Sequence, residues 1–493
     1  MSEAITAQLP AIALAVLLLA APAAFLAGGR AARALSIVAA TIETAVALWI
    51  AVAVAVGGPL YYRIGGWGAP LGIDLRVDGL AAVMIALSGV VGLAVTVYAA
   101  GYFGAEERYR FFWPLWLMLW ASLVALFASN DAFNLYVCLE LVSVSAVALV
   151  SITGSRAALS AAMRYLLAAI LGSLFYLFGV AMLYGAAGVL DLDVLGQVIR
   201  ATPAAQAGLA LALTGLVIKT ALVPMHFWLP PAHANAASPV SAVLSALVVK
   251  GSFYIALRLY FAVAGTLSVS ALAQLLGILG AVAIVWGSIQ AFTQTRLKML
   301  VAYSTVAQIG YLFVLFPLVA ASTEASSAAT AVSAGVFHAL SHALAKSAMF
   351  LAAGAVLVRF GHDRIGELHG LARRAPAQAF AFGLAGVSML GLPPSGGFVS
   401  KWLYITAALE TGAWPWAAVV LGGGLLAAAY VFRVVGIFMA QPLGDTPLAD
   451  AHPALSWVPL ALALASVFLG VFGQPVLDLI APAIGMLVQG VVS

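Results

Sequence analysis

Long apolar segments recur along the whole chain, and short polar connections separate them. An α-helix of about 20 predominantly apolar residues crosses the hydrocarbon core of a bilayer. The pattern therefore predicts an all-α polytopic membrane protein with about fourteen transmembrane helices. The expected spans are 9–27, 34–56, 78–100, 111–128, 132–152, 161–186, 205–229, 239–263, 271–292, 297–320, 330–358, 377–409, 415–438 and 455–480.

Composition agrees with this pattern. Hydrophobic residues make up 65% of the chain and charged residues 8%, whereas soluble domains carry about 25% charged residues. A chain of 493 residues with so few charges cannot cover a core with polar surface, which excludes a soluble fold. The single cysteine, Cys138, excludes a disulfide framework and a cysteine-rich metal or iron–sulfur site. We expect a surrounding lipid bilayer, no cofactor and no nucleic-acid partner.

Lysine and arginine residues gather in alternate connections. Cytoplasmic connections of membrane proteins carry an excess of these residues. With an even number of helices, the asymmetry predicts a bacterial or archaeal cytoplasmic membrane with both termini outside. The richer connections hold Arg30, Arg33, Arg108, Arg110, Arg156, Arg296, Lys298, Arg359, Arg364, Arg373 and Arg374, and the poorer ones hold Arg63, Arg76 and Arg200.

The connection between the second and third spans contains the stretch GGWGAPLGIDLRVDGL, residues 65–80. In it, Ile73, Leu75 and Val77 alternate with polar residues, which is the period of a half-buried strand. A short external hairpin is expected there, and a plain loop fits the pattern equally well.

Several charged residues fall inside apolar spans. The chain has five lysines, and four of them, together with Glu140, lie in spanning segments. Each such group costs about 2.5–3.5 kcal/mol at a helix centre, so a functional role outweighs a structural one. A lysine ammonium loses its proton readily when it is desolvated, whereas a guanidinium does not. The four lysines are Lys219, Lys250, Lys346 and Lys401.

Two of these lysines lie beside helix-breaking residues. Lys219 precedes Pro224, and Lys401 follows Pro393 and Pro394. Proline removes an amide donor and clashes with the preceding turn, so both helices should break within the membrane. A matched pair of broken helices is typical of transporters built from inverted repeats.

These breaks suggest two inverted five-helix repeats, in which helices 7 and 12 are broken. Arg433 would then fall in the second repeat near the position of Lys250 in the first. The expected parts are 1–110 (helices 1–3 with the hairpin), 111–263 (helices 4–8), 271–438 (helices 9–13) and 439–493 (helix 14).

The segment GVFHALSHALAKSAMF places His338, His342 and Lys346 at positions i, i+4 and i+8, on one helix face. Histidine titrates near neutrality, so this row can pass a proton along, directly or through water. A zinc site is the alternative. It is disfavoured because no glutamate adjoins either histidine and no third ligand is evident, so no metal is expected.

Other polar residues carry weaker signals. His226 and His233 follow the break after Lys219, and each is as consistent with a hydrogen-bonded interfacial residue as with proton transfer. Ser304 and Gln308 could hold water or bond between helices. These four residues and Arg433 are possible accessory residues.

Acidic residues outside this set are expected to have no role in transport. Glu43 lies in the second span without an evident partner, and we expect it to snorkel or face the lipid edge. Asp74, Asp78, Asp131 and Glu410 are expected to be solvated residues at the membrane rim. The chain has neither a phosphate-binding GxxxxGK[ST] loop nor a GxGxxG turn between strand and helix. Energy must therefore come from an ion gradient or a partner subunit.

The chain resembles the antiporter-like membrane subunits shared by respiratory complex I and the Mrp-type multisubunit cation/proton antiporters. The resemblance spans about residues 65–435 and includes NLYVCLEL, IKTALVPMHFWLPPAHA, LKMLVAYSTVAQIGYL, FHALSHALAKSAMFLAAGA and GLPPSGGFVSKW. Length and the GGW stretch are most similar to the D subunit of Mrp antiporters. The family often has an acid where this chain has Pro231.

The resemblance implies fourteen helices in two inverted repeats and a role for each buried charge. It implies a Glu140–Lys219 pair, a connecting lysine at Lys250, a relay of His338, His342 and Lys346, and an exit lysine at Lys401.

We therefore expect a proton-translocating subunit of a monovalent cation/proton antiporter, with other membrane subunits as partners and protons, sodium or potassium as ions. One alternative is a pump subunit of complex I or a membrane-bound hydrogenase, driven by electron transfer elsewhere. Others are a membrane subunit of an inorganic-carbon uptake complex and a scaffold without transport, although a scaffold has no need of such costly buried charges.

Overall fold

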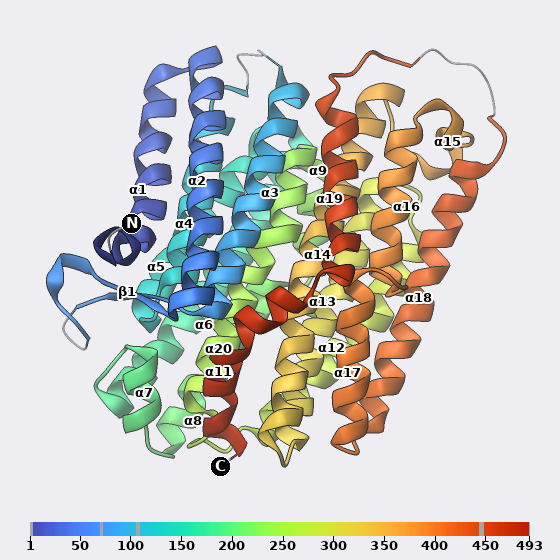
Figure 1. Ribbon diagram of the computed structural model, residues 1–493. Helices are drawn as coiled ribbons and strands as arrows, with labels where there is room; N and C mark the ends of the chain where they lie inside the picture. Colours follow the sequence, from blue (N-terminus) through green and yellow to red (C-terminus); the bar gives the residue numbers. More distant parts are fainter. Residues whose placement is uncertain (1–2, 70–71, 105–108, 443–447, 493) are drawn as a thin grey trace.

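The computed structural model describes residues 3–69, 72–104, 109–442 and 448–492, and it is a helical bundle with one small hairpin (Figure 1). Its first part comprises α1 (Glu3–Ala27), α2 (Gly29–Gly57), α3 (Gly79–Phe103), α4 (Phe112–Ala128), α5 (Ala132–Ser151), α6 (Arg156–Ala187), α7 (Leu192–Val198), α8 (Pro203–Thr220), α9 (Leu229–Asn235), α10 (Ser238–Val243), the π-helical turn η3 (Leu244–Val248) and α11 (Val249–Ala264).

The second part begins with α12. It comprises α12 (Ser270–Thr293), α13 (Leu297–Ala321), α14 (Ala325–Phe360), η4 (Ile365–Glu367), α15 (Leu371–Arg374), α16 (Pro376–Leu390), α17 (Gly396–Glu410), α18 (Trp414–Met439), α19 (Ala454–Val471) and α20 (Gln474–Val492). The expected all-α polytopic fold is confirmed. Thirteen helices of the described chain are long and apolar enough to cross a membrane, and the shorter apolar helices α4 and α16 fall within two further expected spans.

Both predicted helix breaks are present. α8 ends at Thr220, Ala221 takes a left-handed conformation with φ 60°, and helix resumes only at Leu229. α16 ends at Leu390, and α17 begins at Gly396. The residues between the half-helices are non-helical, which leaves backbone carbonyl groups without intrahelical partners.

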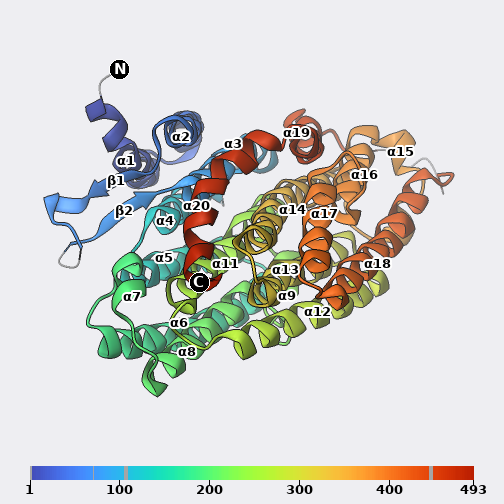
Figure 2. The same ribbon diagram turned by 60° about the horizontal axis from the view of Figure 1, so that its bottom comes forward.

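The single final span expected at 455–480 is wrong. α19 ends at Val471, and α20 begins at Gln474 and runs obliquely across the bundle (Figures 1 and 2). Pro475 lacks an amide hydrogen, so it fits the first turn of a new helix but cannot continue the old one. A Cβ on Gly473 would lie 2.6 Å from the Phe337 ring, so only glycine fits this turn.

The hairpin forms, but its first strand lies upstream of the stretch that predicted it. Strand β1 (Leu60–Arg63) pairs antiparallel with β2 (Asp74–Val77), with Leu60 opposite Val77, and the turn η1 (Ile64–Gly66) follows β1. β2 leads directly into α3, so the hairpin fixes where α3 begins.

Alternate connections lie at the same end of the bundle. The start of α2 and the short helix α15, both rich in arginine, lie at the top of Figure 1, whereas the hairpin, α7 and the C-terminus lie toward the other end. Arg108 lies outside the described residues.

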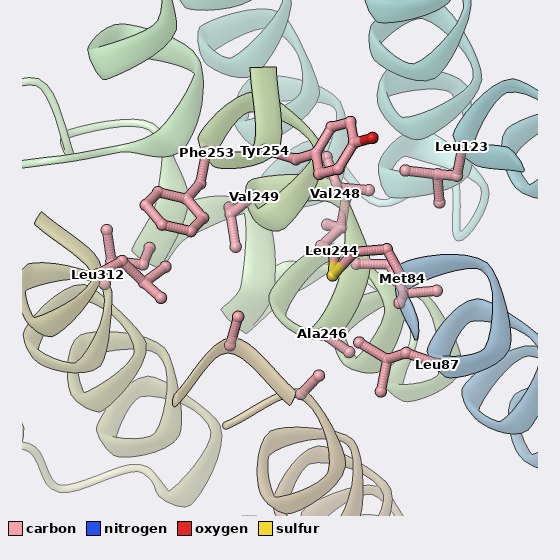
Figure 3. Close-up of a cluster of buried hydrophobic side chains, with 14 of the residues drawn as sticks. Met84, Leu87, Leu123, Leu244, Ala246, Val248, Val249, Phe253, Tyr254 and Leu312 are labelled. Atoms are coloured by element: carbon pink, nitrogen blue, oxygen red, sulfur yellow. The ribbon is translucent and has the colours of Figure 1, made fainter. Parts of the chain in front are cut away.

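The interior is built around η3, α11, α13 and α14, which other helices enclose (Figure 2). Figure 3 shows how apolar side chains from α3, α4 and α13 converge on the segment that contains η3 and the start of α11. Every residue from Ser238 to Tyr260 is buried. Lys250 therefore lies in a segment whose surroundings are almost entirely apolar.

Candidate functional site

All five lysines are buried. Lys250 and Lys346 are fully enclosed, and Lys401, the most exposed of the five, keeps 7% of its surface. Lys298 was expected in a solvated connection, and that expectation is wrong. Its side chain is 2% exposed and donates to Ala236 O at 2.5 Å, because the linker between α9 and α10 covers the start of α13.

Lys219 and Glu140 form an ion pair between α8 and α5. Lys219 Nζ lies 3.0 Å from Glu140 Oε1 and 2.8 Å from Ser143 Oγ. The Ser173 hydroxyl on α6 also donates to Glu140 Oε1. The pair thus joins three helices, and each partner stabilises the charged form of the other.

Glycines bring α6 and α8 close enough for this contact. A Cβ on Gly215 would lie 2.3 Å from Gly172 O, and a Cβ on Gly172 would lie 2.9 Å from the Lys219 Cγ. Small residues allow helix backbones to approach closely inside a membrane. The lysine stem therefore runs along the α6 backbone toward Ser173.

Glu140 is less enclosed than the sequence suggested. It keeps 30% of its side-chain surface, whereas Lys219 keeps 5%. Neighbouring residues on the same face of α5, Val137, Leu141 and Val144, are exposed. The carboxylate therefore opens onto the side of the bundle, while its lysine partner points inward.

Lys250 lies directly after the π-helical turn η3. Its ammonium donates to Ser245 O, five residues earlier, and to His342 Nδ1 at 2.5 Å. π-helical turns interrupt regular helix hydrogen bonding and occur often at functional sites. This interruption joins Lys250 on α11 to the histidine row on α14.

The histidine row faces α13. The rings of His338 and His342 lie 5.8 Å apart with an 11° angle between their planes. His338 Nε2 donates to Gln308 O at 3.1 Å, and Lys346 Nζ donates to Val301 O at 3.2 Å and to the Ser304 hydroxyl. Ser304 and Gln308, expected as accessory residues, therefore contact the row directly.

Lys401 lies at the second helix break. Its ammonium donates to Met389 O at 2.9 Å and to Leu390 O at 2.7 Å, which end α16, and it lies 4.9 Å from the centre of the Tyr311 ring. The carboxyl end of a helix attracts cations because its last carbonyls are unsatisfied. Gln308 Nε2 also reaches Met389 O, at 3.4 Å, which links Lys401 to the residue that His338 contacts.

The step from Lys219 to Lys250 is indirect. No hydrogen bond joins the two lysines in the part of the chain that the structure describes. Thr220 and Ser252, which adjoin them on α8 and α11, share a hydrogen bond of 2.9 Å. This hydroxyl pair is the polar bridge between the two helices.

Several buried ring nitrogens have no hydrogen-bond partner. Among the described residues they include His338 Nδ1, His342 Nε2 and both nitrogens of His233, and also His226 Nδ1 and His362 Nδ1. His233 on α9 is 1% exposed and stacks on Phe350 with ring centres 4.8 Å apart. Unpaired buried polar atoms are rare and mark places for water or a transferred proton. His233 therefore belongs with the buried polar groups.

Two expected accessory residues lie elsewhere. His226 is only partly buried and accepts a hydrogen bond of 3.3 Å from Trp286 Nε1. Arg433 donates to the carbonyls of Phe292 and Gln294 at the end of α12. Arg433 caps a helix at the periphery of the bundle.

Sequence reasoning missed other buried charges. Glu43 is fully buried at the centre of the inner face of α2, so the lipid-edge role is wrong, and neither carboxylate oxygen has a partner among the described residues. Asp78, expected at a solvated rim, is 1% exposed and accepts two hydrogen bonds from Arg258. A usable signal was the position of Arg258 in α11, two turns after Lys250 on the same face.

The remaining acidic residues differ in exposure. Glu410 is exposed, and Asp74 and Asp131 are partly buried. Asp131 caps α5 by accepting from the amides of Phe133 and Asn134. Among the described residues, no group of three or more His, Cys, Asp or Glu side chains could hold a metal ion.

Residues 129–427 match the family described as NADH:quinone oxidoreductase/Mrp antiporter, TM, which covers more than half of the chain. Residues 67–112 match the family described as NADH-Ubiquinone oxidoreductase (complex I), chain 5 N-terminus.

Known proteins similar to the chain include subunits of NADH-quinone oxidoreductases and of cation/proton antiporters. The NADH-quinone oxidoreductase subunit N of Desulforudis audaxviator is 37% identical over 442 residues, which cover 86% of each chain. The D subunit of the Na(+)/H(+) antiporter of Alkalihalophilus pseudofirmus is 27% identical over 412 residues, 81% of this chain and 79% of the relative. A chain of the Mrp complex from Dietzia sp. superposes with a TM-score of 0.88 at 25% identity and covers 100% of both chains.

Proposed function

Because the chain belongs to the family of NADH:quinone oxidoreductase and Mrp antiporter membrane subunits, we propose that it conducts protons within a multisubunit monovalent cation/proton antiporter. The observation that carries this proposal is a row of ionisable groups that contact one another directly or through intervening polar groups. It runs from the Glu140–Lys219 pair to Lys250 and His342, and on to Lys401.

Protons would enter the row at Lys219 from the cytoplasmic side. Lys219 holds its charge while Glu140 is paired with it, and separation of the carboxylate from the ammonium group favours release of the lysine proton. The Thr220–Ser252 hydroxyl pair, with water, would carry the proton to Lys250. His342 takes it next through the 2.5 Å contact with Lys250.

The row then leads outward through the second helix break. His342 and His338 stack on one another, and Lys346 lies one turn further along α14. Between His338 and Lys401, Gln308 and the Met389 carbonyl would hold the water that carries the proton, because the carbonyls themselves only accept hydrogen bonds. Lys401 would release the proton to the external side. Only neutral groups surround its ammonium, so release of the proton leaves no unpaired carboxylate behind.

The open face of Glu140 supports assembly with another membrane subunit. A carboxylate with 30% of its surface exposed would face hydrocarbon in an isolated chain, at a cost of several kcal/mol. A neighbouring subunit that covers α5 would remove this cost. It would also let the neighbour change the Glu140–Lys219 distance, which couples the two subunits.

The topology that we propose has both termini outside. The arginine-rich end of the bundle, with α15 and the start of α2, would face the cytoplasm by the positive-inside rule. Residues 111–263 and 271–438 would form the two inverted repeats, with 1–110 and 439–493 flanking them. The matched breaks after Lys219 and before Lys401 support this division.

The decisive test is Lys219→Ala. In vesicles that contain the assembled complex, this variant should abolish transport driven by a pH gradient, because the proton loses its first buried carrier. Arg164→Ala is the control, because it removes an exposed positive charge from the same half. Full transport by Lys219→Ala in a correctly assembled complex refutes the proposal.

A second candidate is the same proton pathway driven by electron transfer in a partner. The 37% identity to an NADH-quinone oxidoreductase subunit N favours it. Purification in mild detergent followed by mass spectrometry separates the two. Redox subunits with iron–sulfur clusters would indicate the driven pump, and further membrane subunits without them would indicate the antiporter.

A further inference from the structure

A row of polar side chains on α11 leads from Lys250 toward the end of the bundle that we propose to be external. It is a second possible route for a proton, besides the one through His342. Lys250, Tyr254 and Arg258 occupy positions i, i+4 and i+8 of α11, which is one helix face. A rise of about 1.5 Å per residue puts the backbone of Arg258 about 12 Å beyond that of Lys250. α11 runs toward the end where the hairpin and α7 lie (Figure 1).

Water can reach the outer end of this route. A cavity of about 220 Å³ lies there, and both Arg76 and Arg258 line it, together with Asn130 and Asp193. Met486 and Gly490 of α20 cover its other side. Only the groups between this cavity and Lys250 separate the buried proton row from the external medium.

The Arg258–Asp78 pair lies at that position. Arg258 Nη1 donates to Asp78 Oδ2 at 2.7 Å, and Nη2 donates to Asp78 Oδ1 at 2.5 Å. Asp78 also accepts from the Ala81 amide at 3.0 Å, which caps α3, and Arg76 lies 3.6 Å away. Burial alone would raise the pKa of Asp78, but the charge and hydrogen bonds of Arg258 outweigh it and hold the pKa below its usual value.

The Tyr254 hydroxyl has no free position for proton transfer. It accepts from Arg258 Nε at 3.1 Å and from Nη2 at 3.0 Å, and it donates to Phe127 O at 2.8 Å. A hydroxyl has one donor and two acceptor positions, so all three are occupied. A proton arriving from Lys250 finds no acceptor there.

We propose that the Arg258–Asp78 pair, with Tyr254, is an external plug that closes the route from Lys250 and so directs protons toward His342 and Lys401. The guanidinium cannot release a proton, so it cannot take part in a relay. The plug rests on the proposed function, because it assumes that Lys250 carries a proton.

The first test removes both charges, since removal of one would leave the other buried and unpaired. The double variant Arg258→Ser/Asp78→Ser, whose small hydroxyl side chains leave room for water, is reconstituted as the full complex and should raise passive proton permeability at least tenfold over the wild type. Arg296→Ser/Asp363→Ser is the matched control, because that ion pair of 3.0 Å joins the 294–296 connection to the loop after α14, remote from α11. Wild-type permeability in the double variant overturns the plug.

A second variant keeps the proposal testable if the double variant does not assemble. Arg258→Lys retains the charge and the partner, but an ammonium can lose its proton. It should leak several-fold more than the wild type, whereas a merely structural ion pair would tolerate it. Leakage equal to that of the wild type in Arg258→Lys overturns the proposal.

The leak must also depend on Lys250. Adding Lys250→Leu to the leaking variant should return permeability to the wild-type level, because the route then has no carrier. A leak that persists without Lys250 overturns the plug as the end of that route. Failure of the proposed function has a different signature, which is full gradient-driven transport in Lys219→Ala.

Discussion

At the scale of single residues, the buried lysines differ in what holds their charge. Lys219 is paired with a carboxylate, whereas Lys250 is held by a carbonyl and an imidazole, and Lys401 by two carbonyls. A carbonyl stabilises an ammonium, but it does not become an uncompensated charge when the proton leaves. Under the proposed function, the lysines beyond the first ion pair would load and unload a proton without a counter-charge.

This arrangement predicts that titration, and not charge alone, is required at Lys250. Lys250→Arg keeps a positive charge beside His342 but cannot release a proton, so proton flux should fall at least tenfold. Arg433→Lys makes the opposite exchange at a residue that only caps α12, and flux should be unchanged. Proton uptake in vesicles measures both. Normal flux in Lys250→Arg would show that a fixed charge is enough.

At the scale of elements, two of the three helix interruptions supply carbonyl groups to a lysine, namely the π-helical turn before Lys250 and the break before Lys401. Two interruptions, after Lys219 and before Lys401, were predictable because proline and glycine mark them in the sequence. The third, the π-helical turn before Lys250, has no such mark. Its geometry depends on the apolar side chains that pack around it (Figure 3), and a pattern along the chain does not contain those contacts.

The close approach of α6 and α8 predicts a specific sensitivity. In Gly215→Ala the new Cβ would lie 2.3 Å from Gly172 O, so the helices must separate. Overpacking of this kind costs about 1–3 kcal/mol, and it should lengthen the Lys219–Glu140 contact. We expect a lower unfolding temperature in detergent and several-fold slower transport. Gly185 is also on α6, but a Cβ added there would meet nothing within 4 Å. Gly185→Ala should therefore change neither the unfolding temperature nor the transport rate.

At the scale of the whole molecule, the sequence predicted the helical architecture and most of the lysine row. It did so because apolar length, proline and charge inside a span are local features. What it missed depends on which distant segment covers a residue. The hairpin positions Asp78 against Arg258, and the α9–α10 linker covers Lys298. Glu43 lies on the inner face of α2, which other helices cover. The spacing of Arg258 after Lys250 marks one partner of the first contact, but no spacing of residues indicates which distant segment covers it.

The orientation of the bundle gives the last prediction. Ala157 and Ala201 are exposed alanines that precede the membrane segments of α6 and α8, and the charge asymmetry puts Ala157 in the cytoplasm and Ala201 outside. In a Cys138→Ala background, Ala201→Cys should react with a membrane-impermeant maleimide in intact cells, whereas Ala157→Cys should react only after lysis. Removing the buried Cys138 ensures that any label reports the introduced thiol. The reverse labelling pattern would invert the topology and with it the direction from Lys219 to Lys401, because the row of contacts itself has no preferred direction.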